Sequence, residues 1–360
     1  MSIVQHRPSR RALVVGATGI AGSAIVEQLT EGDWEVVTLS RTPVERAGVR
    51  HVSADLQSLD SLTEALRNEE ITHVFFTAWI RRETENENID VNSALLRNLL
   101  SAVESSPVQH VALLTGLKQY LGPFESFGKG SMPDTPFHEE EPRLDRPNFY
   151  YAQEDVLWEA AARRGFTWSV HRSHTIIGHA VGNAMNMALT LAAQATICRE
   201  LGRPFVFPGS ATQWNSLVDM TDSEVLAEQM IWASTTEGVG NEAYNIVNGD
   251  VFRWRWMWPR LAGYFGVEAE GFSDSPRPLE DQMKGMEEVW EGIAAKYGLA
   301  EPDLSRVASW WHSDSDLGRD IEVVADMSKC RLAGFTGYRR TLDSFIRLFD
   351  RYKADNIIPQ

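Results

Sequence analysis

Three glycines between an apolar segment and a helical pattern constrain the fold of this chain more than any other feature. Residues 14–22 read VVGATGIAG, preceded by a strand-like segment and followed by a helix-like one. Gly16 permits a tight turn, Gly19 lets the backbone approach a pyrophosphate, and Gly22 lets the helix pack closely on the sheet. The helix N-terminus supplies N–H groups and a positive dipole end. The segment therefore predicts a dinucleotide-binding turn.

The first half of the chain alternates short apolar runs with helical patterns. Strands are expected at 12–15, 35–39, 73–77, 110–114 and 167–171, with one more before Asp55 and a returning strand at 243–247. Helices are expected at 20–29, 62–66, 91–103 and 150–163. This alternation predicts a doubly wound parallel sheet of the Rossmann type, with helices on both faces. Ligands then bind at the carboxyl ends of the strands.

The alternation is lost after residue 178, which predicts a smaller, mostly helical substrate domain. Helices are expected at 182–200, 221–233 and 253–265. The last segment also fits a strand, because its tryptophans alternate and Pro259 weakens a helix interior. The expected division is a nucleotide-binding domain at 1–180, to which 214–250 returns, and a substrate-binding domain at 181–213 and 251–360.

The end of the second strand distinguishes between the two nicotinamide dinucleotides. NAD-binding proteins commonly place an acidic residue there to hold the ribose 2′-hydroxyl. This chain has Ser40 and Arg41 instead, and an arginine can pair with a 2′-phosphate. We therefore expect NADPH or NADP as the cofactor. The other residues expected to contact it are Thr18, Ile20, Asp55, Leu56, Thr77, Ala78, Trp79, Tyr150 and Ile177.

The charge and the cysteine content of the chain limit its binding partners and its location. The formal net charge of −16 over 360 residues repels phosphate backbones and anionic lipid, so we expect neither nucleic acid nor membrane as a partner. Two distant cysteines, Cys198 and Cys330, cannot build a disulfide framework, which favours a cytoplasmic location. The histidines at 171, 174 and 179 lack the ligand spacing of a metal site, so no metal is expected. The oligomeric state is left open, a homodimer included.

Several longer segments carry a family resemblance. They read TGLKQYLGPF at 115–124, NFYYAQED at 148–155, NIVNGDVF at 245–252 and DMSKC at 326–330. Together with the glycine motif, they resemble the progesterone 5β-reductase and iridoid synthase-like family of atypical extended short-chain dehydrogenases/reductases. The resemblance covers nearly the whole chain.

The resemblance implies NADPH-dependent 1,4-reduction of a C=C bond conjugated to a carbonyl, in a steroid-, terpenoid- or small-enone-like substrate. The usual Tyr-x-x-x-Lys motif is missing in that family, and here Glu154 stands four residues after Tyr150. The resemblance assigns catalysis to Lys118 and Tyr150, which stabilise the enolate oxygen. Gln119 and Ser173 depart from the family's common residues, which leaves the natural substrate open.

The substrate is expected to be a small, hydrophobic, carbonyl-conjugated molecule in a largely apolar cavity. The residues expected to contact it are Phe124, Phe127, Met185 and Phe335. Two other functions remain open. One is a carbonyl reductase or epimerase on the same scaffold, which the displaced lysine disfavours. The other is a non-catalytic NADP-sensing regulator, which the presence of both Lys118 and Tyr150 disfavours.

Overall fold

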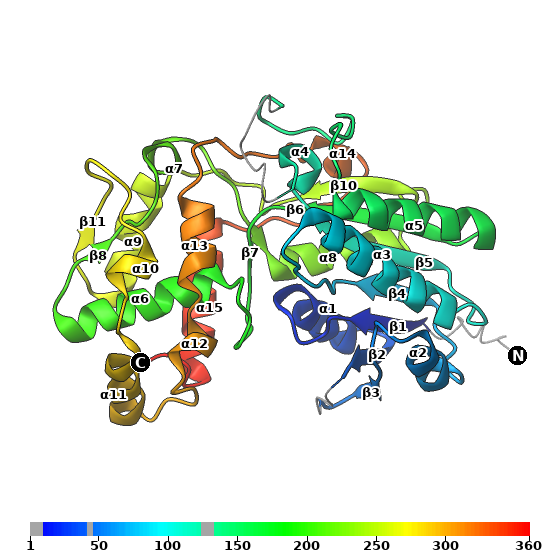
Figure 1. Ribbon diagram of the computed structural model, residues 1–360, viewed down its shortest axis with the longest axis horizontal. Coiled ribbons are helices and arrows are strands. Elements are labelled where there is room, and N and C mark those ends of the chain that lie inside the picture. The colour runs from blue at the N-terminus through cyan, green and yellow to red at the C-terminus, as the bar shows by residue number, and fades with distance from the viewer. Residues whose placement is uncertain (1–9, 42–45, 124–132) are drawn as a thin grey trace, which may run out of the picture.

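The computed structural model describes residues 10–41, 46–123 and 133–360. Within these residues, seven parallel strands form one sheet in the order β10-β6-β5-β4-β1-β2-β3 (Figure 1). Strand β4 reads HVFF and is buried throughout, as in parallel sheets that are covered on both faces. The strands are β1 (Arg10–Val15), β2 (Trp34–Ser40), β3 (Val49–Ser53), β4 (His73–Phe76), β5 (His110–Gly116), β6 (Thr167–Ser173) and β10 (Glu242–Ile246).

Helices cover both faces of the sheet through two separate apolar clusters. One cluster joins the sheet to the side of α2, α3 and α5, with Leu62, Leu96 and Leu157 fully buried. The other joins it to α1 and α8, with Ile25 and Leu226 fully buried. These helices are α1 (Ile20–Glu31), α2 (Leu59–Leu66), α3 (Glu85–Ala102), α5 (Phe149–Arg164) and α8 (Ser223–Thr235). The doubly wound Rossmann-type fold expected from the sequence is confirmed.

The strand order reverses beside β1. The chain runs outward from β1 through β2 to β3, then returns to β1's other side with β4. The carboxyl ends of β1 and β4 are joined there, because the N–H of Thr77 donates to the carbonyl of Val15 at 3.0 Å. A crevice forms at such a switch point, outside the carboxyl ends of the strands.

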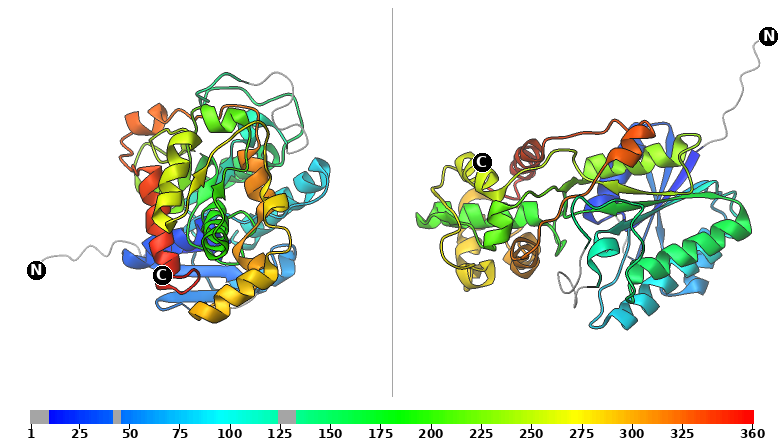
Figure 2. Two further views of the ribbon diagram at one scale, coloured as in Figure 1. Left: turned by 90° about the vertical axis from the view of Figure 1, so that its left-hand side faces the viewer. Right: turned by 90° about the horizontal axis from the view of Figure 1, so that it is seen from above.

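A second lobe lies beside these carboxyl ends and is mostly helical (Figures 1 and 2). Its core contains Trp254, Trp258 and Trp290, each at most 1% exposed. The elements of this lobe are α6 (Met187–Leu201), β8 (Phe205–Val206), α7 (Ala211–Asn215), α9 (Trp254–Phe265), β11 (Ala269–Glu270), α10 (Leu279–Gln282), α11 (Glu287–Tyr297), α12 (Leu304–Val307), α13 (Trp310–Leu317) and α15 (Thr341–Ala354).

Short elements and ion pairs connect the lobe to the sheet. Arg351 of α15 pairs with Glu27 of α1 at 3.1 Å, and Arg347 pairs with Asp222 at 2.7 Å. The connecting elements are α4 (Lys118–Leu121), the paired β7 (Ile176–Ile177) and β9 (Thr221–Asp222), and α14 (Ser328–Leu332). Every helix in the described part of the chain is too short or too polar to cross a membrane.

Helix boundaries differ from the sequence expectations where polar caps outweigh apolar periodicity. Helix α3 begins at Glu85 instead of 91, because Thr84 and Glu87 form a capping box. Helix α8 is capped by Asp222, whose carboxylate accepts from the N–H of Glu224, and residue 221 belongs to β9. The 253–265 segment is a helix even though Pro259 lies inside it.

Candidate active site at the carboxyl edge of the sheet

A cavity of about 730 Å³ opens at the carboxyl ends of the strands, between the sheet and the helical lobe. The glycine turn, the strand ends and the lobe each contribute to its wall. Twelve residues expected from the sequence to form the site line it: Gly16, Thr18, Gly19, Ile20, Gly22, Arg41, Thr77, Ala78, Trp79, Lys118, Tyr150 and Met185. The structure thus brings together residues that are up to 169 positions apart in the sequence.

The glycine turn is too tight for larger residues. Gly16 has a φ of +86°, and a Cβ there would lie 2.7 Å from the hydroxyl oxygen of Thr77. A Cβ at Gly22 would lie 2.2 Å from the carbonyl oxygen of Gly16. The turn closes when the N–H of Gly19 donates to that same carbonyl at 3.0 Å. The N-terminus of α1 therefore faces the cavity at close range, where it can hold a pyrophosphate.

Arg41 is exposed and follows β2 directly at the cavity wall. The contact between Arg41 and a 2′-phosphate, expected from the sequence, stays a prediction. Four other residues expected to contact the cofactor are not among those that line the described cavity. Asp55 caps its own loop, since its carboxylate accepts from the N–H of Gln57 at 3.0 Å. The four residues outside the lining are Ser40, Asp55, Leu56 and Ile177, and their contacts with the cofactor stay predictions.

Lys118 begins α4, two residues after the end of β5, and is only 4% exposed. Its ammonium nitrogen lies 3.5 Å from a carboxylate oxygen of Glu85 and 4.5 Å from the centre of the Phe149 ring. A buried ammonium is costly unless a counter-charge lies nearby. Glu85 supplies that counter-charge beside Lys118 at the edge of the cavity.

Tyr150 lies on the first turn of α5, beside the end of β5. A Cβ at Gly116 would lie 3.6 Å from its hydroxyl. Burial, and then the negative charge of Glu85, raise the pKa of Tyr150 well above its usual value. The hydroxyl therefore keeps its proton at neutral pH and can donate a hydrogen bond into the cavity.

The same two side chains hold both Lys118 and Tyr150. Glu85 pairs with Lys118, and its second oxygen accepts from the N–H of Phe149 at 2.7 Å. Asn148 accepts from the N–H of Tyr150 at 3.0 Å and donates to the carbonyl of Lys118 at 2.7 Å. The first turn of α5 and the start of α4 are thereby fixed to each other. A rigid pair of donors at one cavity edge is what stabilisation of a developing oxyanion requires.

The neighbouring tyrosines point elsewhere. The hydroxyl of Tyr151 donates to the carbonyl of Gln119 at 2.7 Å and accepts from the N–H of Leu144 at 3.0 Å. The hydroxyl of Tyr120 donates to the side chain of Asn245 at 2.7 Å. Both hydroxyls are used in structural hydrogen bonds, which leaves Tyr150 as the tyrosine of this group that faces the cavity.

The expectations for the substrate residues have mixed outcomes. Met185 lines the cavity, whereas Phe124 and Phe127 lie outside the described residues. Phe335 was expected to contact the substrate, but the structure places it in the protein core. Phe335 is 4% exposed and packs in the core beside α8, with its ring 5.4 Å from that of Trp232. An aromatic residue near the C-terminus gives no sequence signal that separates a core position from a cavity wall.

Sequence reasoning missed a polar network on the wall of the same cavity. His174 follows β6, and its Nδ1 lies 2.7 Å from Asp219 while its Nε2 lies 2.9 Å from Arg319. Arg319 also pairs with Asp316, and Asp316 accepts from the hydroxyl of Thr175 at 2.6 Å. The carboxyl end of β6 could have been anticipated as a site position. Asp316 and Arg319 come from a region without a recognisable motif.

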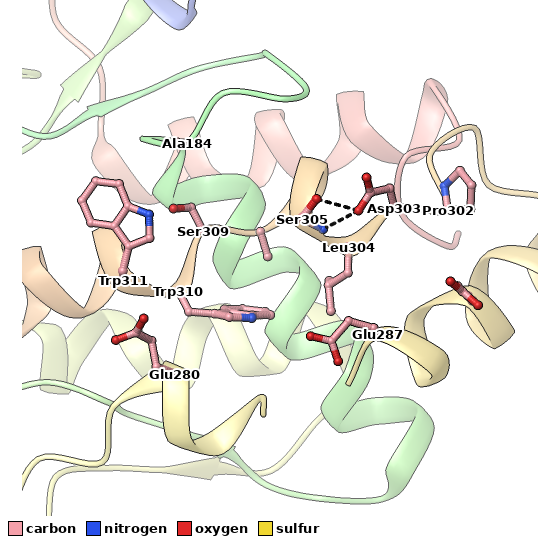
Figure 3. Close-up of a pocket in the computed structure, with 12 residues that line it drawn as sticks. Ala184, Glu280, Glu287, Pro302, Asp303, Leu304, Ser305, Ser309, Trp310 and Trp311 are labelled. Atoms are coloured by element: carbon pink, nitrogen blue, oxygen red, sulfur yellow. Dashed lines mark hydrogen bonds between the residues drawn. The ribbon is translucent and has the colours of Figure 1, made fainter. Parts of the chain in front are cut away.

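A second cavity of about 610 Å³ adjoins the first, and Ala184 and Trp311 line both. Figure 3 shows its wall, where Trp310 lies among Glu280, Glu287 and Leu304. Its carboxylates belong to Glu280, Glu287, Glu291 and Asp303. The described residues contain no group of three or more His, Cys, Asp or Glu side chains that could hold a metal ion.

Solved structures of low sequence identity share the fold. A UDP-glucose 4-epimerase of Thermus thermophilus in complex with NAD has a TM-score of 0.65 and 19% identity, covering 94% of this chain and 99% of that one. A UDP-glucose 4-epimerase of Thermotoga maritima with UDP-glucose has a TM-score of 0.67 and 14% identity, covering 95% and 99%. At these identities the likeness shows the fold alone.

Closer relatives show the family. A 3-oxo-Delta(4,5)-steroid 5-beta-reductase of Arabidopsis thaliana is 39% identical over 97% of this chain and 93% of its own length. An (S)-8-oxocitronellyl enol synthase of Camptotheca acuminata is 38% identical over the same shares. Residues 53–359 match the PRISE-like Rossmann-fold domain. This chain therefore belongs to the family of proteins with a PRISE-like Rossmann-fold domain.

Proposed function

We propose that this chain is an NADPH-dependent reductase of C=C bonds conjugated to a ketone or aldehyde. The observation that carries the proposal is the pair of Lys118, which is buried, and Tyr150, which is half-buried. Glu85 and Asn148 fix this pair at the edge of the cavity that the glycine turn also lines. The names of the relatives, a steroid 5-beta-reductase and an enol synthase, support it. The substrate class is an enone or enal.

The residues present fit a nicotinamide dinucleotide. The turn at 16–22 and the N-terminus of α1 would hold its pyrophosphate, and Arg41 its 2′-phosphate. When bound, that cofactor supplies the hydride. Tyr150 donates a hydrogen bond to the carbonyl oxygen of the substrate, which gains negative charge as the β-carbon is reduced. Lys118 strengthens the positive potential at the same oxygen, and both interactions are strongest in the transition state.

The alternative of a carbonyl reductase or epimerase is weakened by the residue at the usual lysine position. Glu154 stands there, and its carboxylate is 1% exposed. It lies 2.9 Å from Arg143 and 3.6 Å from Arg172. An anion committed to two arginines cannot replace the cationic lysine that relays a proton in that chemistry. The regulator alternative leaves the pair of Lys118 and Tyr150 without a role.

Product analysis tests the reaction type. The protein, NADPH and cyclohexenone are incubated, NADPH oxidation is followed, and the product is identified. We expect cyclohexanone, because the hydride adds to the carbon β to the carbonyl. Cyclohexenol as the product would favour the carbonyl reductase. Absence of NADPH oxidation with every enone and enal tried, despite tight NADPH binding, would favour the regulator.

Cofactor preference depends on Arg41. The unmodified protein is expected to bind NADPH more tightly than NADH, and Arg41→Ala to reduce that preference by about 1.5–3 kcal/mol, or roughly 10- to 100-fold. The lower end is expected because Arg41 is exposed. Dissociation constants for both cofactors, measured by fluorescence titration, check this. Equal affinity in the unmodified protein would rule out the assignment.

The domain division and the cellular location also remain proposals. Strand β10 pairs with β6 in the main sheet, which supports the return of 214–250 to the nucleotide-binding domain. A separate core that contains Met187 and Trp254 supports a substrate-binding domain at 181–213 and 251–360. The buried free thiols of Cys198 and Cys330 are compatible with a cytoplasmic location.

A further inference from the structure

We propose that Trp311 limits the length of the enone or enal that this protein accepts, because its side chain separates the first cavity from the second. This inference rests on the proposed function and narrows its substrate class to short enones and enals. Among the described residues, Ala184 and Trp311 are the two that line both cavities. Ala184 contributes only a methyl group and Trp311 an indole, so the boundary between the cavities depends mainly on Trp311.

The indole of Trp311 adjoins open space instead of the protein core. Figure 3 shows Trp311 and Ala184 on one side of the second cavity, with Glu287 and Pro302 farther along its wall. Trp311 is 40% exposed, whereas the tryptophans in the core of the helical lobe are at most 1% exposed. Loss of the indole would therefore join two open volumes without removing a core side chain.

Contacts from both lobes hold the indole in place. The guanidinium of Arg81, from the loop after β4, lies 4.9 Å from the centre of the Trp311 ring, which is within cation–π range. Helix α13 is itself fixed at two points. Asp314 accepts from the first N–H of α10 at 2.7 Å, and Asp316 accepts from the hydroxyl of Thr175 at 2.6 Å. Trp311, the second residue of this helix, is thus a fixed part of the wall.

The first cavity has limited room for a substrate. Its volume of about 730 Å³ includes the space beside the glycine turn as well as the space beside Lys118 and Tyr150. A nicotinamide dinucleotide would fill the part beside the turn. A long chain on the enone therefore needs additional space to be buried, and the adjoining second cavity, of about 610 Å³, is closed off by Trp311.

The two cavities differ in charge, so the end of a substrate chain can report which cavity it occupies. The described wall of the first cavity contains four Lys and Arg residues and one carboxylate. The described wall of the second contains no Lys, Arg or His, and its carboxylates belong to Glu280, Glu287, Glu291 and Asp303. A chain that ends in a cation is attracted into the second cavity, and one that ends in a carboxylate is repelled.

Substrates of two lengths test the inference. The protein is assayed with NADPH and either hexenal or dodecenal, each with its double bond conjugated to the aldehyde. In the unmodified protein we expect kcat/KM for dodecenal to be no higher than that for hexenal. In Trp311→Ala the dodecenal-to-hexenal ratio should rise by at least about tenfold, because each methylene group that becomes buried contributes roughly threefold or more.

Charged chain ends show where the chain lies. Two further enals of the length of dodecenal end in a trimethylammonium group or in a carboxylate. The ammonium-to-carboxylate ratio of kcat/KM should be at least about threefold higher in Trp311→Ala than in the unmodified protein, since only the variant opens onto the carboxylates of the second cavity. An unchanged ratio would mean that the chain does not enter this cavity, and the inference would be overturned.

Trp256→Ala is the matched control. Trp256 is 41% exposed, Arg260 lies over its ring at 3.9 Å, and it lines neither of the two described cavities. Its substitution removes an equally exposed indole with an arginine on its face, and should leave both ratios unchanged. Melting temperatures show whether each variant is folded, and Trp311→Leu serves if Trp311→Ala is not. An unchanged dodecenal-to-hexenal ratio in a folded Trp311 variant would also overturn the inference.

A binding measurement separates this inference from the proposed reaction. The saturated counterparts of the two charged enals are titrated into the protein with NADP by calorimetry, so that no turnover is needed. A preference for the ammonium chain that is larger in Trp311→Ala than in the unmodified protein supports the partition even if no enal is reduced. Reduction of hexenal, with the same dependence on chain length in both proteins, leaves the proposed function intact and removes the partition.

Discussion

Replacement of Tyr150 by phenylalanine is expected to lower turnover of a simple enone by about 10²–10³-fold. The hydroxyl faces the cavity and keeps its proton, because burial and the charge of Glu85 raise the pKa of Tyr150. Its loss removes a hydrogen bond that strengthens as the carbonyl oxygen gains charge. The phenyl ring that remains fills nearly the same space, so the cavity should keep its shape.

The effect should appear in kcat more than in cofactor affinity. An interaction made mainly in the transition state lowers kcat and kcat/KM together. NADPH binding, measured by fluorescence titration in the absence of enone, is expected to change little. A large loss of NADPH affinity in Tyr150→Phe would instead place the hydroxyl on the nucleotide.

Tyr151→Phe is the matched control, because it removes the neighbouring hydroxyl from the same helix turn. That hydroxyl bonds to Gln119 and Leu144 and not to the cavity. Its loss should cost about 1 kcal/mol of stability per hydrogen bond and have a smaller effect on turnover. Full activity of Tyr150→Phe combined with an inactive, folded Tyr151→Phe would reverse the assignment. Full activity of both would remove oxyanion donation by this segment.

The sheet and the nucleotide side of the cavity were predictable because each depends on local sequence. The glycine spacing at 16–22 fixes a turn through short-range contacts. A Cβ added at Gly22, for example, would lie only 2.2 Å from the carbonyl oxygen of Gly16. Alternation of buried strands and amphipathic helices then predicts a doubly wound parallel sheet. Lys118 and Tyr150 came from the family resemblance, and the structure places both at the cavity.

The helical lobe's contribution was not predictable, because no local pattern marks it. Arg319 lies within hydrogen-bond distance of His174, which is 145 positions away in the sequence, and Lys118 pairs with Glu85, which is 33 positions away. The first pair depends on how the lobe docks on the sheet, and the second on where the start of α3 meets the start of α4. Glu85 was missed for a second reason: the helix was expected to begin at 91, where the apolar periodicity begins. The capping box of Thr84 and Glu87 gave a signal that could have located the true start.

Replacement of Lys118 by methionine is expected to lower both activity and stability. Turnover of a simple enone should fall by roughly 10²-fold, because the cation beside the developing oxyanion is gone. The free energy of unfolding should fall by about 3–5 kcal/mol, since Glu85 is left buried without its counter-charge. Enone turnover and urea denaturation measure the two effects, and NADPH titration shows whether cofactor binding also weakens.

The double variant Lys118→Met, Glu85→Gln separates the two effects. Glutamine can still accept from the N–H of Phe149 through its carbonyl oxygen, as Glu85 does at 2.7 Å, but it carries no charge. Stability should therefore recover in large part, because no buried charge is left unpaired, whereas turnover should stay low. Recovery of turnover together with stability would mean that Lys118 only holds the helix start in place. Recovery of stability alone would assign the lost rate to the ammonium group itself.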